Sequence, residues 1–90
     1  MNPSEQLAAL ADLAESLGVE IRRAPAAEAS GHPGGALVRL KGRDILFLDE
    51  SASPAERIQV LASALAGREE LATMFLPPVL RELLDRAGEG

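Results

Sequence analysis

The stretch from Leu48 to Gly67, LDESASPAERIQVLASALAG, constrains the fold more than any other part of the sequence. A hydrophobic strand ends at its beginning. Ser53, Pro54 and Glu56 then form a helix-capping signature, with serine at the N-cap, proline at the first helical position and glutamate at the third. The residues that follow are apolar around much of a helical circumference, which is typical of a central helix. Since Gly67 is the expected stop, the stretch predicts a helix that packs against a sheet.

A β-hairpin is predicted immediately before this helix, over Gly35–Asp49. Residues 36–40 and 45–48 are mostly hydrophobic and flank the segment KGRD. A two-residue turn at Gly42-Arg43 would place glycine where a type II′ turn needs it. In that pairing Lys41 lies opposite Asp44, which predicts a cross-strand ion pair.

The same pairing divides the large hydrophobic residues between the two faces of the hairpin. The face that we expect to point into the core carries Val38, Leu40, Ile45 and Phe47. The opposite face carries Leu37, Leu46 and Leu48, together with Arg39. This second face is too apolar for free exposure to water, so we expect a partner to cover it.

The N-terminal part of the chain predicts one helix and one short strand. Asn2 caps an amphipathic helix that starts at Pro3 and stops at Gly18. Residues 19–22 alternate apolar and polar side chains, which is typical of a strand with one exposed face. The Pro- and Gly-rich residues 24–35 predict a flexible loop.

The C-terminal part predicts two further helices. Residues 68–75 form the first, and Pro77-Pro78 end it because neither proline donates a backbone hydrogen bond. Residues 79–87 form the second, with a solvated face on which Arg81 and Asp85 make an i,i+4 pair. Residues 88–90 are expected to fray.

The expected fold is a single α+β domain over residues 1–90. An N-terminal helix, a short strand and a β-hairpin precede two to three helices, which pack on a small, mostly antiparallel sheet. Ninety residues suffice for one such domain.

Composition narrows the possible functions. The absence of cysteine excludes disulfides, thiolate metal sites and a cysteine nucleophile. A net charge of −5, scattered basic residues and only two aromatic side chains disfavour nucleic-acid binding. No leader segment is visible, and no apolar run approaches the roughly 18 residues that span a bilayer. We therefore expect a soluble cytoplasmic protein with no membrane partner.

Few residues have the chemistry of a catalytic or metal site. His32 is the only histidine, and a zinc site there would need carboxylates such as Glu28 or Asp49. Asp49 and Glu50 form an acidic pair, which can act as acid and base but also suits a strand end before a helix N-terminus. Ser53 is expected to be occupied in capping. We therefore predict no catalytic residue, no metal ligand and no cofactor.

The order of these elements resembles that of a known enzyme family. A hairpin with an acidic end, S-P-x-x-R at residues 53–57 and an alanine-rich helix resemble the strand-to-helix core of the ImmA/IrrE-like zinc metallopeptidases over residues 4–67. In that family the helix carries an HExxH motif. Here Ser63 and Ala64 stand where the first His and the Glu belong, and Gly67 where the second His belongs. The resemblance implies a peptidase-like fold without its zinc site. The C-terminal LPP-x-x-RE-x-L pattern also resembles the end of some short bacterial proteins.

Two functions from different classes follow. The first is a non-catalytic protein-interaction or regulatory module, able to associate with itself or with another protein. Its interaction residues are the surplus hydrophobic side chains of the hairpin and of the last helix: Leu37, Leu46, Leu48, Val79, Leu80 and Leu83. The alternative is a small hydrolase or metal-dependent enzyme that uses His32 with Asp49 and Glu50. We favour the first, because catalysis needs convergent groups and the sequence offers few.

Overall fold

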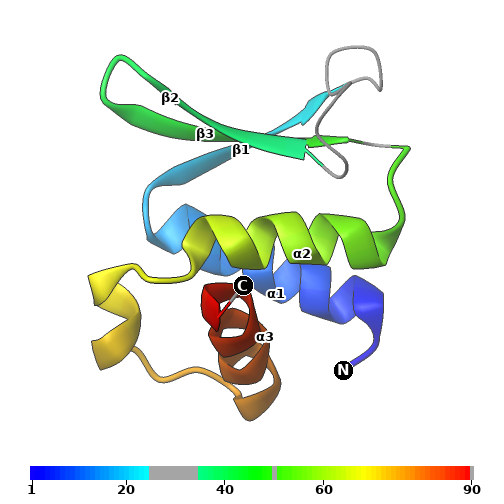
Figure 1. Cartoon of the computed structure of the whole chain (residues 1–90), viewed down its shortest axis with the longest axis vertical. Coiled ribbons are helices and arrows are strands. Elements are labelled where there is room, and N and C mark those ends of the chain that lie inside the picture. Colours follow the sequence, from blue (N-terminus) through cyan, green and yellow to red (C-terminus); the bar gives the residue numbers. More distant parts are fainter. Residues whose placement is uncertain (25–34, 50, 90) are drawn as a thin grey trace.

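A three-stranded sheet, a pair of helices beneath it and a third helix beneath that pair make up the architecture (Figure 1). A computed structural model of the chain describes residues 1–24, 35–49 and 51–89, and these counts refer to those ranges. In chain order the elements are α1 (Pro3–Ser16), β1 (Val19–Ala24), β2 (Gly35–Leu40), β3 (Arg43–Asp49), α2 (Pro54–Leu65), the 3₁₀ helix η1 (Glu69–Thr73) and α3 (Pro78–Glu89).

The α+β class and the predicted order of elements are confirmed. The loop predicted over residues 24–35 lies almost entirely outside the described residues, since 25–34 are not among them. No helix in the described ranges combines the length and the hydropathy needed to cross a membrane. α3 continues through Gly88 to Glu89, two residues further than its sequence pattern indicates.

Both predicted helix caps are present. The Asn2 Oδ1 atom accepts a hydrogen bond of 2.8 Å from the backbone N–H of Glu5, and Pro3 occupies the first turn of α1. The Ser53 Oγ atom accepts one of 3.2 Å from the backbone N–H of Glu56. Caps of this kind contribute about 1 kcal/mol each to helix stability. They set where α1 and α2 begin, and they occupy the Ser53 hydroxyl.

The strands lie in the order β1-β3-β2, so the last strand in sequence is central. β2 and β3 are antiparallel, as the hairpin predicts, whereas β1 is parallel to β3 with Ile21 opposite Leu46. The sheet is therefore mixed. Within the described residues, β1 and β2 each pair on one side only.

The hairpin turn lies one residue earlier than the sequence pattern predicts. Leu40 pairs with Arg43, so the turn residues are Lys41 and Gly42, whose φ angles are 51° and 78°. Two positive φ angles define a type I′ turn, whose twist matches that of the two strands. The predicted type II′ turn and the Lys41–Asp44 pair are both wrong, and Arg39 takes the place opposite Asp44. Because the pairing shifts by an even number of residues, every side chain keeps its predicted face.

The assignment of the core face is wrong for the core that the helices form. Leu46 and Leu48, exposed by 0% and 8%, belong to that core, whereas Val38 and Leu40 are exposed by 40% and 54%. Ile45 is buried as predicted, at 4%, but does not belong to the same cluster. The reason lies in β1, whose apolar Val19 and Ile21 pair beside Asp44 and Leu46. The charged Glu20 and Arg22 pair beside Ile45 and Phe47, although Arg23 pairs beside Leu48. The pairing of β1 therefore decides the face, and this pairing joins segments that are distant in sequence.

The helix α2 is central, as its broad apolar surface predicts. It packs against the sheet above it, α1 beside it and α3 below it (Figure 1). Leu61 and Leu65 of α2 are fully buried, and so is Leu10 of α1. A helix with neighbours on several sides needs apolar residues around most of its circumference, which explains the alanine-rich sequence of α2.

Candidate functional site

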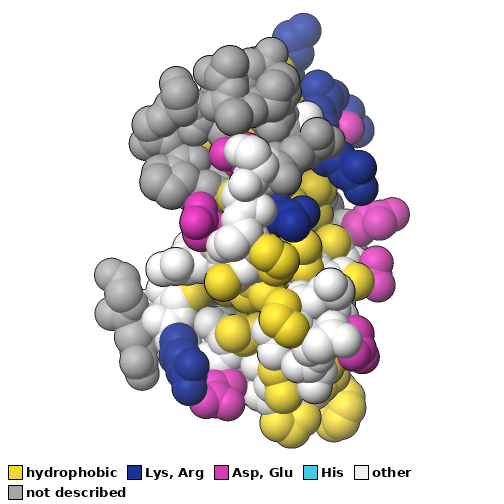
Figure 2. All heavy atoms as spheres, turned by 90° about the vertical axis from the view of Figure 1, so that its right-hand side faces the viewer, with side chains coloured by type: hydrophobic (Ala, Val, Ile, Leu, Met, Phe, Trp, Pro, Cys, Tyr) yellow, Lys and Arg dark blue, Asp and Glu magenta, His cyan; other side chains and the backbone are white. Residues whose placement is uncertain are grey.

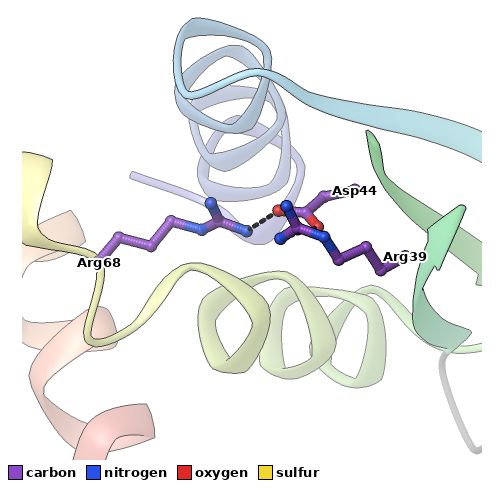
Figure 3. Close-up of polar contacts among 3 residues, drawn as sticks. All are labelled: Arg39, Asp44 and Arg68. Carbon is purple, nitrogen blue, oxygen red and sulfur yellow. Dashed lines mark hydrogen bonds and ion pairs between the residues drawn. The ribbon is translucent and has the colours of Figure 1, made fainter. Parts of the chain in front are cut away.

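The most connected polar cluster joins the sheet to the end of α2. Asp44 of β3 accepts a hydrogen bond of 2.8 Å from the guanidinium of Arg68, which follows α2, and Arg39 of β2 approaches the same carboxylate at 3.5 Å (Figure 3). The hydrogen bond from Arg68, together with the charges of both arginines, lowers the pKa of Asp44. Asp44 is thus held as a carboxylate that connects β3 to the chain after α2, which is a structural role.

The stability contributed by Asp44 is expected to depend on pH. A lowered pKa in the folded state means that the contribution is complete above the unfolded value of 3.8 and is lost as the pH falls through the folded pKa. Asp44→Asn should therefore reduce stability at pH 7, and the difference from wild type should shrink below pH 3.8. Urea denaturation at a series of pH values measures this, and a difference that is constant with pH would contradict it.

Asp49, which belongs to the alternative enzyme hypothesis, has a side chain that is already hydrogen-bonded to a residue two positions along the chain. Its Oδ1 atom accepts hydrogen bonds from the backbone N–H of Ser51 at 2.9 Å and from the Ser51 hydroxyl at 2.7 Å. These bonds, and the nearby charge of Arg57, lower the pKa of Asp49. A general acid or base works best with a pKa near the working pH, so this shift has the wrong direction.

The other members of the enzyme hypothesis lie outside the described residues: Glu28, His32 and Glu50. Within residues 1–24, 35–49 and 51–89, no group of three or more His, Asp or Glu side chains is arranged to hold a metal ion. The hydrolase hypothesis stays a prediction, and no described contact favours it.

The positions that correspond to a peptidase zinc motif do not share a helix face. Ser63 lies within α2, but the helix ends at Leu65. Gly67 lies beyond that end with a φ of 83°. An HExxH motif needs its two histidines one turn apart on one helix, and this backbone does not provide that arrangement at residues 63 and 67.

The six predicted interaction residues do not form one surface. Leu46, Leu48 and Leu80 are buried in the intramolecular core, which contradicts their assignment to a binding face. Val79 and Leu83 are half-buried on α3, on the far side of α2 from the sheet. Leu37 is exposed by 44% and lies on the edge strand β2.

The β2 edge, which comprises the strand Gly35–Leu40, is the best candidate site. Leu37, Val38 and Leu40 are three of the large hydrophobic residues that the described chain exposes, at 44%, 40% and 54%. Sequence reasoning missed Val38 and Leu40 because it assigned them to the core. The missing signal was the strand order, which leaves β2 at the edge of the sheet. Natural proteins rarely leave a hydrophobic edge strand open, since it offers a template for another strand.

A depression of about 540 Å³ runs between the β2 edge and α2. Most of its described lining is apolar, and among the described lining residues the one carboxylate belongs to Glu56. Its lining residues are Ala36, Leu37 and Leu46 from the sheet and Glu56, Gln59, Val60, Ser63 and Ala64 from α2. An added strand that pairs with β2 would direct alternate side chains into this depression.

A second apolar depression, of about 640 Å³, lies where the N-terminal ends of α1 and α2 meet α3. Figure 2 shows hydrophobic side chains gathered in the middle of this face. The hydrophobic lining residues are Pro3, Ala55, Ile58, Ala62, Leu83 and Ala87. Phe75, exposed by 96%, lies in the segment between η1 and α3. Neither feature offers open backbone groups, so the β2 edge remains the stronger candidate.

No protein-family model matches the chain, nor does any curated protein or solved structure. The resemblance to the zinc metallopeptidases therefore stays a prediction.

Proposed function

We propose that this chain is a non-catalytic protein-interaction module that binds an extended polypeptide segment along β2. The observation that carries the proposal is an edge strand with three exposed hydrophobic residues beside an apolar depression. Addition of a strand to an open sheet edge is a common mode of peptide recognition. In that mode the backbone supplies affinity and the depression selects the side chains.

The hairpin geometry indicates which backbone groups of β2 are available. In a two-residue hairpin, the residues that flank the turn form a hydrogen-bonded pair, here Leu40 and Arg43. Every second residue then bonds to β3, which accounts for Val38 and Ala36. The intervening residues Leu37 and Arg39 direct their N–H and C=O groups away from β3. An incoming strand would pair with these groups.

The depression favours a particular ligand chemistry. Leu37, Val60 and Ala64 suit an aliphatic side chain, and burial of one such side chain contributes about 1.5–3 kcal/mol. Glu56 favours a basic residue elsewhere on the same face of the ligand. We therefore expect an extended segment in which an aliphatic and a basic residue alternate with residues that face the other way.

A peptide titration tests this function. Peptides that carry the aliphatic–x–basic pattern are added to ¹⁵N-labelled protein, and we expect the largest shifts at the amides of Leu37 and Arg39. Arg39→Pro removes an outward N–H and leaves the backbone hydrogen bonds between β2 and β3 in place, so it should weaken binding about tenfold or more. It also removes the 3.5 Å ion pair with Asp44, so circular dichroism of the variant checks that it is folded. Phe75→Ser is the matched control, because it removes an exposed hydrophobic residue remote from the edge and should leave binding unchanged. Shifts centred on another surface would refute the assignment of the β2 edge.

A further inference from the structure

The β2 strand itself has the pattern that the depression favours. Leu37 and Arg39 project from the same face, the one that points toward the helices, and they are two residues apart along the strand. The strand thus presents an aliphatic and a basic residue at the required spacing. The β2 edge and its depression are therefore complementary to β2 of another molecule of the same chain.

We propose that the partner is a second copy of this chain, paired through β2 in an antiparallel, two-fold symmetric manner. This inference rests on the proposed function and names the partner for that same edge. Two-fold homodimers are the most common soluble oligomers, and their interfaces use one surface twice. The pairing would join two sheets into one continuous sheet.

The register between the two β2 strands depends on which backbone N–H and C=O groups point away from β3. The outward backbone groups belong to Gly35, Leu37 and Arg39, so these residues must pair among themselves. The longest overlap places Leu37 opposite Leu37 of the second copy, on the two-fold axis. Gly35 then lies opposite Arg39 of the second copy. Because this pairing joins like faces, the helices of both copies lie on the same side of the joined sheet.

Charge complementarity supports a second copy as the occupant. Arg39 of the second copy arrives opposite Gly35, at the N-terminal end of β2. Glu56, in the first turn of α2, lines the depression, and α2 begins below the end of the sheet at which β2 starts and β3 ends (Figure 1). Symmetry forms this arginine–glutamate pair twice. Opposite charges placed in this way determine register and specificity.

Arg39 can exchange its intramolecular partner, Asp44, for Glu56 of the second copy. Its side chain is 73% exposed, and its distance to Asp44 is 3.5 Å. Asp44 retains the shorter contact of 2.8 Å with Arg68. Moving Arg39 to Glu56 of the second copy therefore leaves no unpaired carboxylate behind.

A charge-exchange experiment tests the proposal by sedimentation equilibrium over a concentration series. Wild type is expected to dimerise. R39E places two carboxylates together in both pairs, and E56R places two guanidinium groups together, so each variant alone should dimerise about tenfold or more weakly. In an equimolar mixture, the heterodimer of R39E and E56R contains one arginine–glutamate pair with the two charges exchanged. Its other pair is the native one between Arg39 and Glu56. The mixture should therefore associate about as well as wild type. Circular dichroism of each variant checks that it is folded.

The outcomes separate this inference from the proposed function. A wild-type chain that stays monomeric up to about 1 mM, or a mixture that associates no better than either variant alone, overturns self-pairing in this register. A dimer that is indifferent to both substitutions overturns it too, since another surface would then be used. The peptide titration is independent of these results: a monomer that binds peptides at Leu37 and Arg39 retains the proposed function, and one that does not loses both.

Discussion

Leu46→Ala is expected to lower the free energy of unfolding by about 3 kcal/mol, and Leu40→Ala by less than about 0.5 kcal/mol. The two leucines lie on adjacent strands and point to opposite faces of the hairpin. Leu46 is fully buried in the core with α1 and α2, whereas Leu40 is exposed by 54%. Truncation of Leu46 removes its transfer free energy and leaves a cavity, while truncation of Leu40 removes mainly solvated surface.

Urea denaturation of the two variants measures this difference. The comparison is matched, because both substitutions remove the same atoms from a strand of the same hairpin. Protein concentrations below those at which the chain associates keep Leu40 free of any second copy. Equal losses, or a larger loss for Leu40→Ala, would show that the helices cover the face of Val38 and Leu40 instead.

The features that could be predicted from the sequence are those encoded by neighbouring residues. Asn2 and Ser53 cap helices within their own first turns, so a short stretch of sequence contains both the donor and the acceptor. The broad apolar surface of α2 likewise predicts its position between the sheet and α3. Features that depend on neighbouring residues in this way can be predicted from the sequence.

The features that were missed depend on residues that are distant in sequence. The turn at Lys41-Gly42 places a lysine at positive φ, which local preference disfavours but the twist of the paired strands favours. The core face of the hairpin follows from the parallel pairing of β1 with β3. The candidate edge follows from the same strand order, because β2 is outermost only when β3 lies between it and β1.

The contacts of Arg81 are another feature that depends on residues distant in sequence. The sequence predicts an i,i+4 pair with Asp85 on a solvated face, and this prediction is wrong. Its guanidinium instead donates hydrogen bonds to two backbone carbonyls, that of Leu71 at 3.1 Å and that of Met74 at 2.8 Å. Arginine side chains can bond to carbonyls near a helix C-terminus. The Leu71 carbonyl, which already accepts a bond of 3.3 Å from the N–H of Met74, gains Arg81 as a second donor. No local pattern indicates that η1 and α3 meet in this way.

Arg81→Ala is therefore expected to lower the free energy of unfolding by about 2 kcal/mol, since hydrogen bonds that involve a charged group contribute roughly 1.5–3 kcal/mol. Arg86→Ala is the matched control on the same helix. Arg86 contacts Glu82 at 2.6 Å, but both side chains are largely exposed, at 72% and 64%. An exposed i,i+4 pair contributes only about 0.3–0.5 kcal/mol.

Arg81→Lys distinguishes the two carbonyl contacts from the loss of charge. A lysine keeps the positive charge but lacks the planar fork that reaches both carbonyls, so we expect it to recover less than half of the stability lost in Arg81→Ala. Amide hydrogen exchange of Leu71 and Met74 should accelerate in both variants, because η1 is held to α3 through these contacts. If Arg81→Ala costs no more than Arg86→Ala, the connection between η1 and α3 depends on the burial of Leu71 and Leu80 alone.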